Sequence, residues 1–136
     1  MSLIADIKRH EGYSKVIYKD TLGKDTIGYG FLIKALELDE DVCDIILERK
    51  LVKNERTLRR NLDWYDDKSP YVKDVLQEMF YQLHYKLFQF KKTLHYIEND
   101  KYKAASIEML DSLWAKQCAN RAQETSEKMA RADENL

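Results

Sequence analysis

The sequence predicts an α+β fold that is predominantly α-helical. The chain of 136 residues has only four glycines and one proline, which is too few turn-forming residues for an all-β fold. All four glycines lie between Gly12 and Gly30, and only this part of the chain has strand-like patterning. From Leu38 onwards, apolar residues recur at helical spacing. These observations predict a small β-containing region followed by a larger helical one.

The N-terminal region is expected to contain a short helix and a hairpin. Apolar residues at helical spacing, a capping Ser2 and a terminating Gly12 predict a helix over residues 3–11. Residues 16–20 and 26–33 are β-branched and aromatic, and a glycine-containing turn separates them. They therefore predict two strands of a small sheet.

The rest of the sequence predicts helices. A long helix is expected over residues 39–62, with acids early and bases late, an order that complements the helix dipole and requires no binding partner. Ser69-Pro70 predicts the start of an apolar helix at the centre of the core. Further helices are expected around residues 88–97, after a capping Asp100, and from a capping Asn120 to about residue 132.

Composition excludes several classes of partner. The formal charge is −1, so no global attraction to nucleic acid or to an anionic membrane is expected. Aromatic and basic residues alternate over 84–92. Such a segment can stack on single-stranded nucleic acid, but core packing is the preferred interpretation. Neither a metal nor a cofactor is expected, because no ligand spacing or phosphate-binding loop is present.

Cysteine usage and the chain start bear on localisation. Cys43 and Cys118 match no metal or redox spacing, and we expect them to be buried free thiols, with a disulfide left open. The first residues show no charged leader, and no window is apolar enough to span a membrane. A cytoplasmic protein without membrane insertion is therefore expected.

Three residues in the glycine-rich region are candidates for catalysis. Glu11 ends the predicted first helix, Asp20 lies in the hairpin turn, and Thr26 begins the returning strand. Hydrolysis of a glycosidic bond requires an acid on the leaving oxygen and a second carboxylate across the bond. Two acids nine residues apart are common in proteins, so the residues alone leave open that they are solvated surface acids.

The motifs around these residues resemble a known family. Glu11-Gly12-Tyr13, Tyr18-Lys19-Asp20, Gly23 and Thr26-Ile27-Gly28-Tyr29-Gly30 are similar to the signature of the phage-type lysozymes (endolysins) of glycoside hydrolase family 24, which include the lysozymes of T-even phages. The resemblance implies one lysozyme-like catalytic domain over residues 1–136. Its β-containing lobe would cover about 12–36, its connecting helix 39–62, and its helical lobe 1–11 with 63–136, with a cleft between the lobes.

The resemblance also implies roles for residues. Glu11 would be the general acid, Asp20 and Thr26 would hold the attacking water, and the anomeric centre would invert. The substrate would be the β-1,4 bond between N-acetylmuramic acid and N-acetylglucosamine in peptidoglycan. Other expected cleft residues are Gly30, Phe31, Leu32, Gln117 and Arg121.

In the same family pattern, Trp114 belongs to the core and Arg121 reaches towards Glu11. The alternative for Arg121 is an ordinary surface cation. The resemblance further implies a monomer that lyses a bacterial host after release through a holin-type pore.

Of two departures from the family pattern, the first should affect stability more than chemistry, and the second concerns substrate binding. Phe31 stands where relatives often have histidine, and only Lys34 to Glu37 join the strand region to the long helix, where relatives often carry a longer lower lip of the cleft. Two other hypotheses remain: a lysozyme-like module that binds glycan or assembles into a particle without cutting, and an unrelated helical interaction domain.

Overall fold

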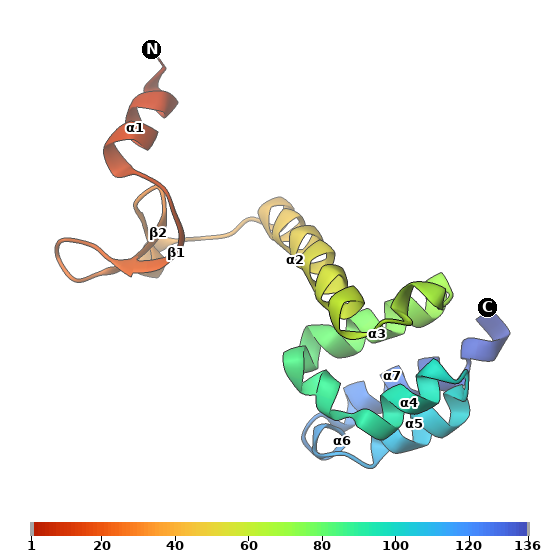
Figure 1. Ribbon diagram of the computed structural model, residues 1–136. Coiled ribbons are helices and arrows are strands. Elements are labelled where there is room, and N and C mark those ends of the chain that lie inside the picture. The colour runs from red at the N-terminus through yellow and green to blue at the C-terminus, as the bar shows by residue number, and fades with distance from the viewer. Residues whose placement is uncertain (1, 136) are drawn as a thin grey trace. The chain divides into compact units, whose positions relative to one another are not determined.

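The computed structural model describes residues 2–135 and confirms a predominantly helical α+β fold (Figure 1). Two compact units are present, Met1–Asp44 and Ile45–Leu136. The first contains α1 (Leu3–Glu11), β1 (Ser14–Lys19), β2 (Asp25–Gly28), β3 (Phe31–Leu32) and the start of α2 (Glu40–Asn61). The second contains the rest of α2, α3 (Pro70–Leu83), α4 (Lys91–Glu98), α5 (Tyr102–Leu110), α6 (Leu113–Gln117) and α7 (Ala119–Ala130). Short 3₁₀ helices cover Ile33–Ala35, Tyr65–Asp67, His84–Gln89 and Ala132–Asn135. The assignment of residues 1–11 to the helical lobe stays a prediction.

The first helix has the ends that the sequence predicts. The Ser2 hydroxyl accepts a hydrogen bond from the Ala5 N–H at 3.0 Å, which satisfies one free donor of the first turn. Gly12 ends the helix with φ of 71°, a backbone conformation that glycine adopts readily. Glu11 is consequently the last residue of α1.

The sheet is antiparallel, with strand order β1-β2-β3. The prediction of one strand over residues 26–33 was wrong, because the chain turns at Tyr29-Gly30 and returns as β3. Gly28 and Gly30 have φ of 68° and 74°, values that interrupt an extended strand. The glycines therefore divide the predicted strand into two paired ones, and β2 becomes the central strand.

The core of the second unit forms around α3, as predicted. Pro70 occupies the first turn of α3, and the Ser69 hydroxyl accepts from the Val72 N–H at 3.2 Å. The helix buries five apolar side chains, Val72, Val75, Leu76, Met79 and Phe80. In this unit α5 packs against α4 and α7, and α7 also contacts α3. These contacts bury the apolar faces of four helices in one core.

Three expectations about helix starts were wrong. The segment around residues 88–97 consists of a 3₁₀ helix over His84–Gln89 followed by α4. The last long helix begins at Ala119, so Asn120 lies within it and does not cap it. Asp100 caps nothing, because α5 begins only at Tyr102 and the Asp100 side chain bonds elsewhere.

Both cysteines are free and exposed, which corrects the expectation of buried thiols. Cys43 lies near the start of α2, a helix in which only Leu58 is fully buried. Cys118 lies at the junction between α6 and α7. Neither position turns towards the core, so small apolar character alone did not determine where these residues lie.

A buried lysine joins two distant segments of the second unit. The Lys68 ammonium donates to the Glu98 carbonyl at 2.9 Å and to Asp100 Oδ1 at 2.7 Å. It also lies over the rings of Trp64 and Tyr102, at 5.5 and 5.7 Å from their centroids. Because its side chain is only 6% exposed, these partners compensate for the loss of water around a charge.

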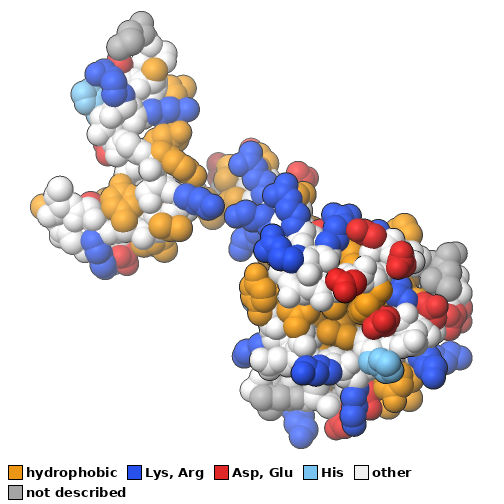
Figure 2. Space-filling view, in the orientation of Figure 1, with side chains coloured by type: hydrophobic (Ala, Val, Ile, Leu, Met, Phe, Trp, Pro, Cys, Tyr) orange, Lys and Arg blue, Asp and Glu red, His pale blue; other side chains and the backbone are white. Residues whose placement is uncertain are grey.

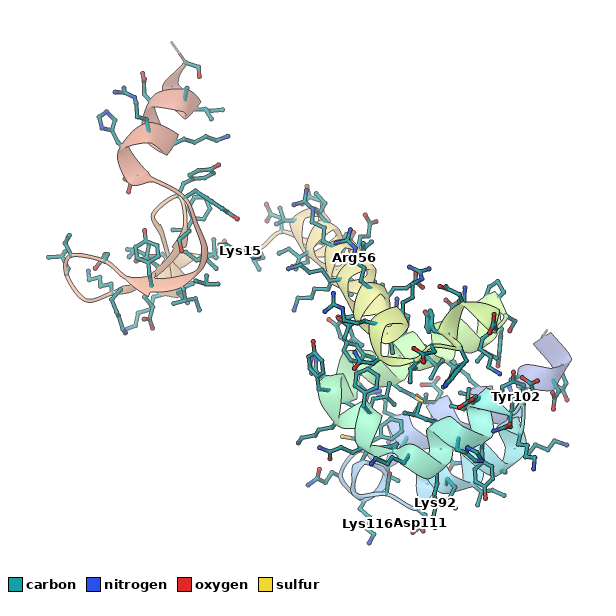
Figure 3. All side chains as sticks on the ribbon, viewed as in Figure 1. Lys15, Arg56, Lys92, Tyr102, Asp111 and Lys116 are labelled. Carbon is teal, nitrogen blue, oxygen red and sulfur yellow. The ribbon has the colours of Figure 1, made fainter. Side chains whose placement is uncertain are left out.

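Asp100 accepts hydrogen bonds from two side chains, Lys68 and Tyr102. Tyr102, labelled in Figure 3, donates its hydroxyl to Asp100 Oδ1 at 2.8 Å. The hydrogen bond from Lys68, and then the one from Tyr102, hold the pKa of the Asp100 carboxyl below its ordinary value. Burial together with the Asp100 bond raises the pKa of the Tyr102 hydroxyl.

We expect Asp100→Asn to destabilise the protein in a pH-dependent way. A carboxyl with a depressed folded-state pKa stabilises the fold above its unfolded pKa, and loses this contribution as the pH falls through the folded value. The difference in unfolding free energy between wild type and variant should have its largest value above about pH 5 and should decrease as the pH is lowered. Urea titrations from neutral to acidic pH measure it. Asp63→Asn, at an exposed aspartate, is the control, and an equal response of both variants would contradict the interpretation.

Candidate functional site

The end of α1 rests against the turn between β2 and β3. A Cβ atom built on Gly30 would lie 2.9 Å from Glu11 Cδ and closer still to Oε2, distances that atoms in proteins do not adopt. Glycine is therefore required at position 30 for the Glu11 carboxylate to lie where it does. Beside this contact, Lys8 Nζ lies 5.2 Å from the centroid of the Tyr29 ring. The helix end and the turn thus position Glu11 together.

Asp20 is held by the hairpin turn that it begins. Its Oδ1 atom accepts hydrogen bonds from the Leu22 and Lys24 N–H groups at 2.9 and 2.8 Å. Its own N–H donates to the Lys24 carbonyl at 2.9 Å, and its carbonyl accepts from the Gly23 N–H. Aspartate is favoured in such turns because its side chain bonds the backbone two residues on. One carboxylate oxygen is therefore occupied by the turn, and Oδ2 makes no hydrogen bond within residues 2–135.

Thr26 is the buried member of the group. It lies on β2, opposite Tyr18 on one side and Leu32 on the other, and is 2% exposed. Its hydroxyl donates to the Lys24 carbonyl at 2.9 Å. The hydroxyl proton is therefore committed to the backbone, and the lone pairs of Oγ1 stay available to accept.

Lys24 connects Asp20 with Thr26 through its backbone alone. Its N–H binds the carboxylate, and its carbonyl binds the hydroxyl. Asp20 Oδ2 and Thr26 Oγ1 are then both left as acceptors. The sequence carries no signal for this role of Lys24, because its side chain has no part in it.

Phe31 and Leu32 follow the turn that contains Gly30. The Phe31 ring lies against Gly28, where a Cβ would approach it to 2.7 Å, and it meets the Tyr29 ring edge-on with centroids 6.2 Å apart. Both side chains stay exposed, by 47% for Phe31 and 38% for Leu32. This leaves apolar surface on the strand that pairs with Thr26.

The other two predicted cleft residues belong to the second unit. Arg121 is exposed in the first turn of α7 and lines a hollow of about 510 Å³ together with Gln77 and Tyr81. Gln117 ends α6 and lines a different hollow, of about 410 Å³, beside Trp114. Glu11, Asp20 and Thr26 thus share the first unit, while the proximity of Arg121 to Glu11 stays a prediction.

Trp114 has the core position that the family pattern implies. It is 6% exposed and belongs to the apolar core of the second unit. Its indole N–H donates to Gln82 Oε1 at 3.2 Å, as a buried tryptophan requires. Trp114 therefore serves packing and not chemistry.

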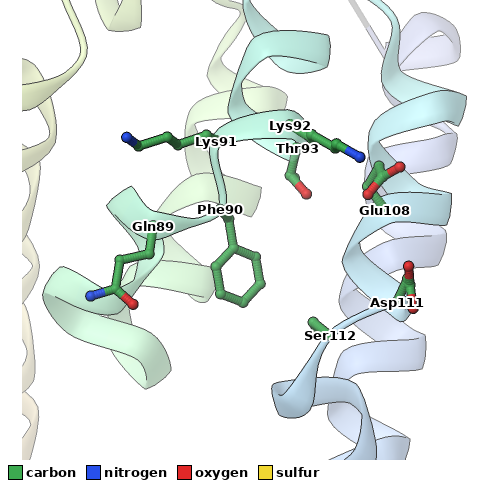
Figure 4. A pocket seen from close by; sticks show the side chains of 8 residues that line it. All are labelled: Gln89, Phe90, Lys91, Lys92, Thr93, Glu108, Asp111 and Ser112. Carbon is green, nitrogen blue, oxygen red and sulfur yellow. The ribbon is translucent and has the colours of Figure 1, made fainter.

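A further hollow, of about 280 Å³, lies where α4 begins and α5 ends (Figure 4). Lys91 and Lys92 lie at its edge, and so do Glu108 and Asp111. This mixture of charges favours neither an anion nor a cation. Within residues 2–135, no three His, Cys, Asp or Glu side chains cluster so as to hold a metal ion, and no described helix is long and apolar enough to cross a membrane.

We expect Gly30→Ala to displace the Glu11 carboxylate, whereas Gly23→Ala should not. Both glycines have φ near 75° (74° and 76°), so each substitution should lower the unfolding free energy by about 1–2 kcal/mol. Only at position 30 would the new methyl group collide with Glu11, since the space around Gly23 is open. The ¹³C shift of the Glu11 carboxyl, measured by NMR, should change in the first variant only. Equal shifts in both variants would refute the contact.

One family model matches this chain. The model of the family described as Phage lysozyme matches residues 8–132, a span that includes Glu11, Asp20, Thr26 and the segment around Trp114. No curated protein sequence matches the chain. Because the family match covers nearly the whole sequence, the chain belongs to the phage lysozyme family.

Proposed function

We propose that this lysozyme is an endolysin that hydrolyses the β-1,4 bond between N-acetylmuramic acid and N-acetylglucosamine in peptidoglycan, with inversion. The family supports lysozyme activity on peptidoglycan. The observation that carries the proposal further is the pair of free acceptors, Asp20 Oδ2 and Thr26 Oγ1, joined through the Lys24 backbone. In a retaining mechanism the second carboxylate attacks the sugar itself and would have no need of a hydroxyl beside it. The pair of acceptors therefore favours inversion.

In this mechanism Glu11 supplies the proton. The bond between the anomeric carbon and the leaving oxygen breaks, and the Glu11 proton goes to that oxygen. Gly30 keeps the space in which the carboxyl lies. Glu11 leaves the reaction as a carboxylate and must regain a proton from solvent before the next turnover.

Asp20 and Thr26 activate the water. The water donates one hydrogen to each acceptor, and its oxygen attacks the anomeric carbon from the face opposite the leaving group while Asp20 takes the proton. Inverting enzymes place their two carboxyls about 6.5–9.5 Å apart to leave room for this water. That separation between Glu11 and Asp20 is part of the proposal.

Substrate binding and biological context complete the proposal. The glycan strand would run past Gly30, Phe31 and Leu32, and residues Gln117 and Arg121 would contact it from the second unit. The enzyme would act as a monomer in lysis of a bacterial host, waiting in the cytoplasm for release through a holin-type pore. The exposed apolar surface of Phe31 and Leu32 supports sugar contact, because sugar rings present apolar faces.

We expect Glu11→Gln to abolish hydrolysis while the fold survives. Glutamine has the same shape but cannot donate a proton to the leaving oxygen, so release of reducing ends from purified peptidoglycan should fall by about 10²–10⁴-fold. The matched control is Glu37→Gln, at an exposed acid of the same unit, which should retain full activity. Full activity of Glu11→Gln would overturn the assignment. Wild-type protein that sediments with peptidoglycan but releases no reducing ends would instead support the non-cleaving module.

Two substitutions of Asp20 should separate its turn role from its chemical role. Asparagine retains an oxygen that accepts from Leu22 and Lys24, so Asp20→Asn should keep its melting temperature and lose hydrolysis. Alanine removes that acceptor and leaves two turn donors unpaired, so Asp20→Ala should lower the unfolding free energy by about 1–3 kcal/mol as well. Calorimetry and reducing-end release on both variants measure the two effects. Active Asp20→Asn would exclude Asp20 as the base.

A further inference from the structure

Four cations form a stripe along one face of α2. Arg49, Lys53, Arg56 and Arg60 follow the spacing i, i+4, i+7 and i+11, which places them above one another on a helix. Their span is about 16 Å at the rise of an α-helix. All four are exposed, and Lys and Arg side chains gather over α2 in Figure 2. Figure 3 labels Arg56 on this helix. We call these four residues the α2 stripe.

The α2 stripe differs from the cations of the second unit that bind acids within the fold. Arg59 is bound to Glu55 and Asp66, and the ammonium groups of Lys68 and Lys128 are paired as well. Within residues 2–135, no ion pair joins the stripe to an acid. Its charges are therefore not used to hold the fold together.

The helix dipole does not account for the stripe either. The dipole favours cations only in the last turn, and the basic residues there are Arg59 and Arg60. Arg49, Lys53 and Arg56 lie earlier in the helix. Like charges at i, i+3 and i, i+4 repel each other and destabilise a helix. The expectation that dipole complementarity explains these bases is thus incomplete for three of the four.

We propose that the α2 stripe is an accessory binding surface for the peptidoglycan strand, through the free carboxylates of its peptides; this rests on the proposed function. A linear array of cations matches a polymer with repeated anions better than it matches a single ion. Arginine forms paired hydrogen bonds with carboxylates. A hollow of about 390 Å³ is lined by Arg49, Lys53 and Arg56 together with Glu48 and Val52, so cations outnumber acids three to one around it.

The stripe supplies the attraction that the whole chain lacks. With a formal charge of −1, the protein as a whole is not drawn to an anionic wall, but a local cluster of one sign raises the concentration of an anionic ligand beside it.

The test compares two charge-matched variants in the Glu11→Gln background, which prevents digestion of the ligand. One carries Arg49→Gln, Lys53→Gln and Arg56→Gln; the other carries Lys101→Gln, Lys103→Gln and Lys116→Gln, at exposed lysines elsewhere in the second unit. Each loses three positive charges. Co-sedimentation with purified sacculi freed of phosphate polymers gives the affinity. We expect the stripe variant to bind about tenfold more weakly than the control at low salt.

Salt and conservative substitution show whether the effect is one of charge. The two affinities should converge at about 1 M salt, where screening is strong, and Arg49→Lys with Arg56→Lys should keep most of the binding. Equal binding of the stripe variant and the control at low salt would overturn the proposal. So would a stripe variant that loses binding to duplex DNA but not to sacculi.

The two proposals can fail separately. If protein with an intact Glu11 releases no reducing ends, the proposed hydrolysis fails, whatever the stripe binds. If it does release them and the stripe variant sediments like the control, only the α2 stripe proposal fails.

Discussion

The proposed chemistry of this protein depends on one short stretch of backbone, the Lys24 peptide groups between a turn and a strand. The Lys24 N–H binds the Asp20 carboxylate and its carbonyl binds the Thr26 hydroxyl. The first bond occupies Asp20 Oδ1 and leaves Oδ2 free, and the second uses the Thr26 hydroxyl proton and leaves the lone pairs of Oγ1 free. In the proposed mechanism these two acceptors hold a water. A change that moved this backbone would disturb both residues together. The pairing of β2 with β1 and β3 keeps it in place.

Glycine makes room for Glu11. Gly30 has a positive φ and no side chain, and both properties are needed: the first makes the turn into β3, and the second admits the Glu11 carboxyl. The position of Glu11, the proposed acid, thus depends on close approach, whereas that of Asp20, the proposed base, depends on hydrogen bonds. Steric fit at Gly30 and hydrogen bonds from the hairpin turn thus hold the proton donor and the proton acceptor of the proposed reaction, both within the first unit.

The second unit is stabilised by different means and contributes different surfaces. Its apolar core surrounds α3, and the buried Lys68 joins the segment before α3 to the connection between α4 and α5. Four of its cations, Arg59, Lys68, Lys73 and Lys128, are paired with acids, whereas the α2 stripe is a row of cations on one helix face. A charged helix face is usually a solvated one; the position of these charges on one line, three of them before the last turn, is what favours a ligand.

The sequence by itself determined the fold class, the ends of α1, the start of α3 and, through the resemblance, the family. These depend on local patterns: apolar spacing, capping residues and glycines at turns. Only the tertiary structure decided that residues 26–33 form two strands, that Asp100 binds Lys68 and does not cap a helix, and that both cysteines are exposed. Lys68 and Asp100 are 32 residues apart, and the Lys24 contacts are made by backbone atoms that every residue has. Side-chain identity at one position cannot report contacts that arise from backbone direction and from distant partners.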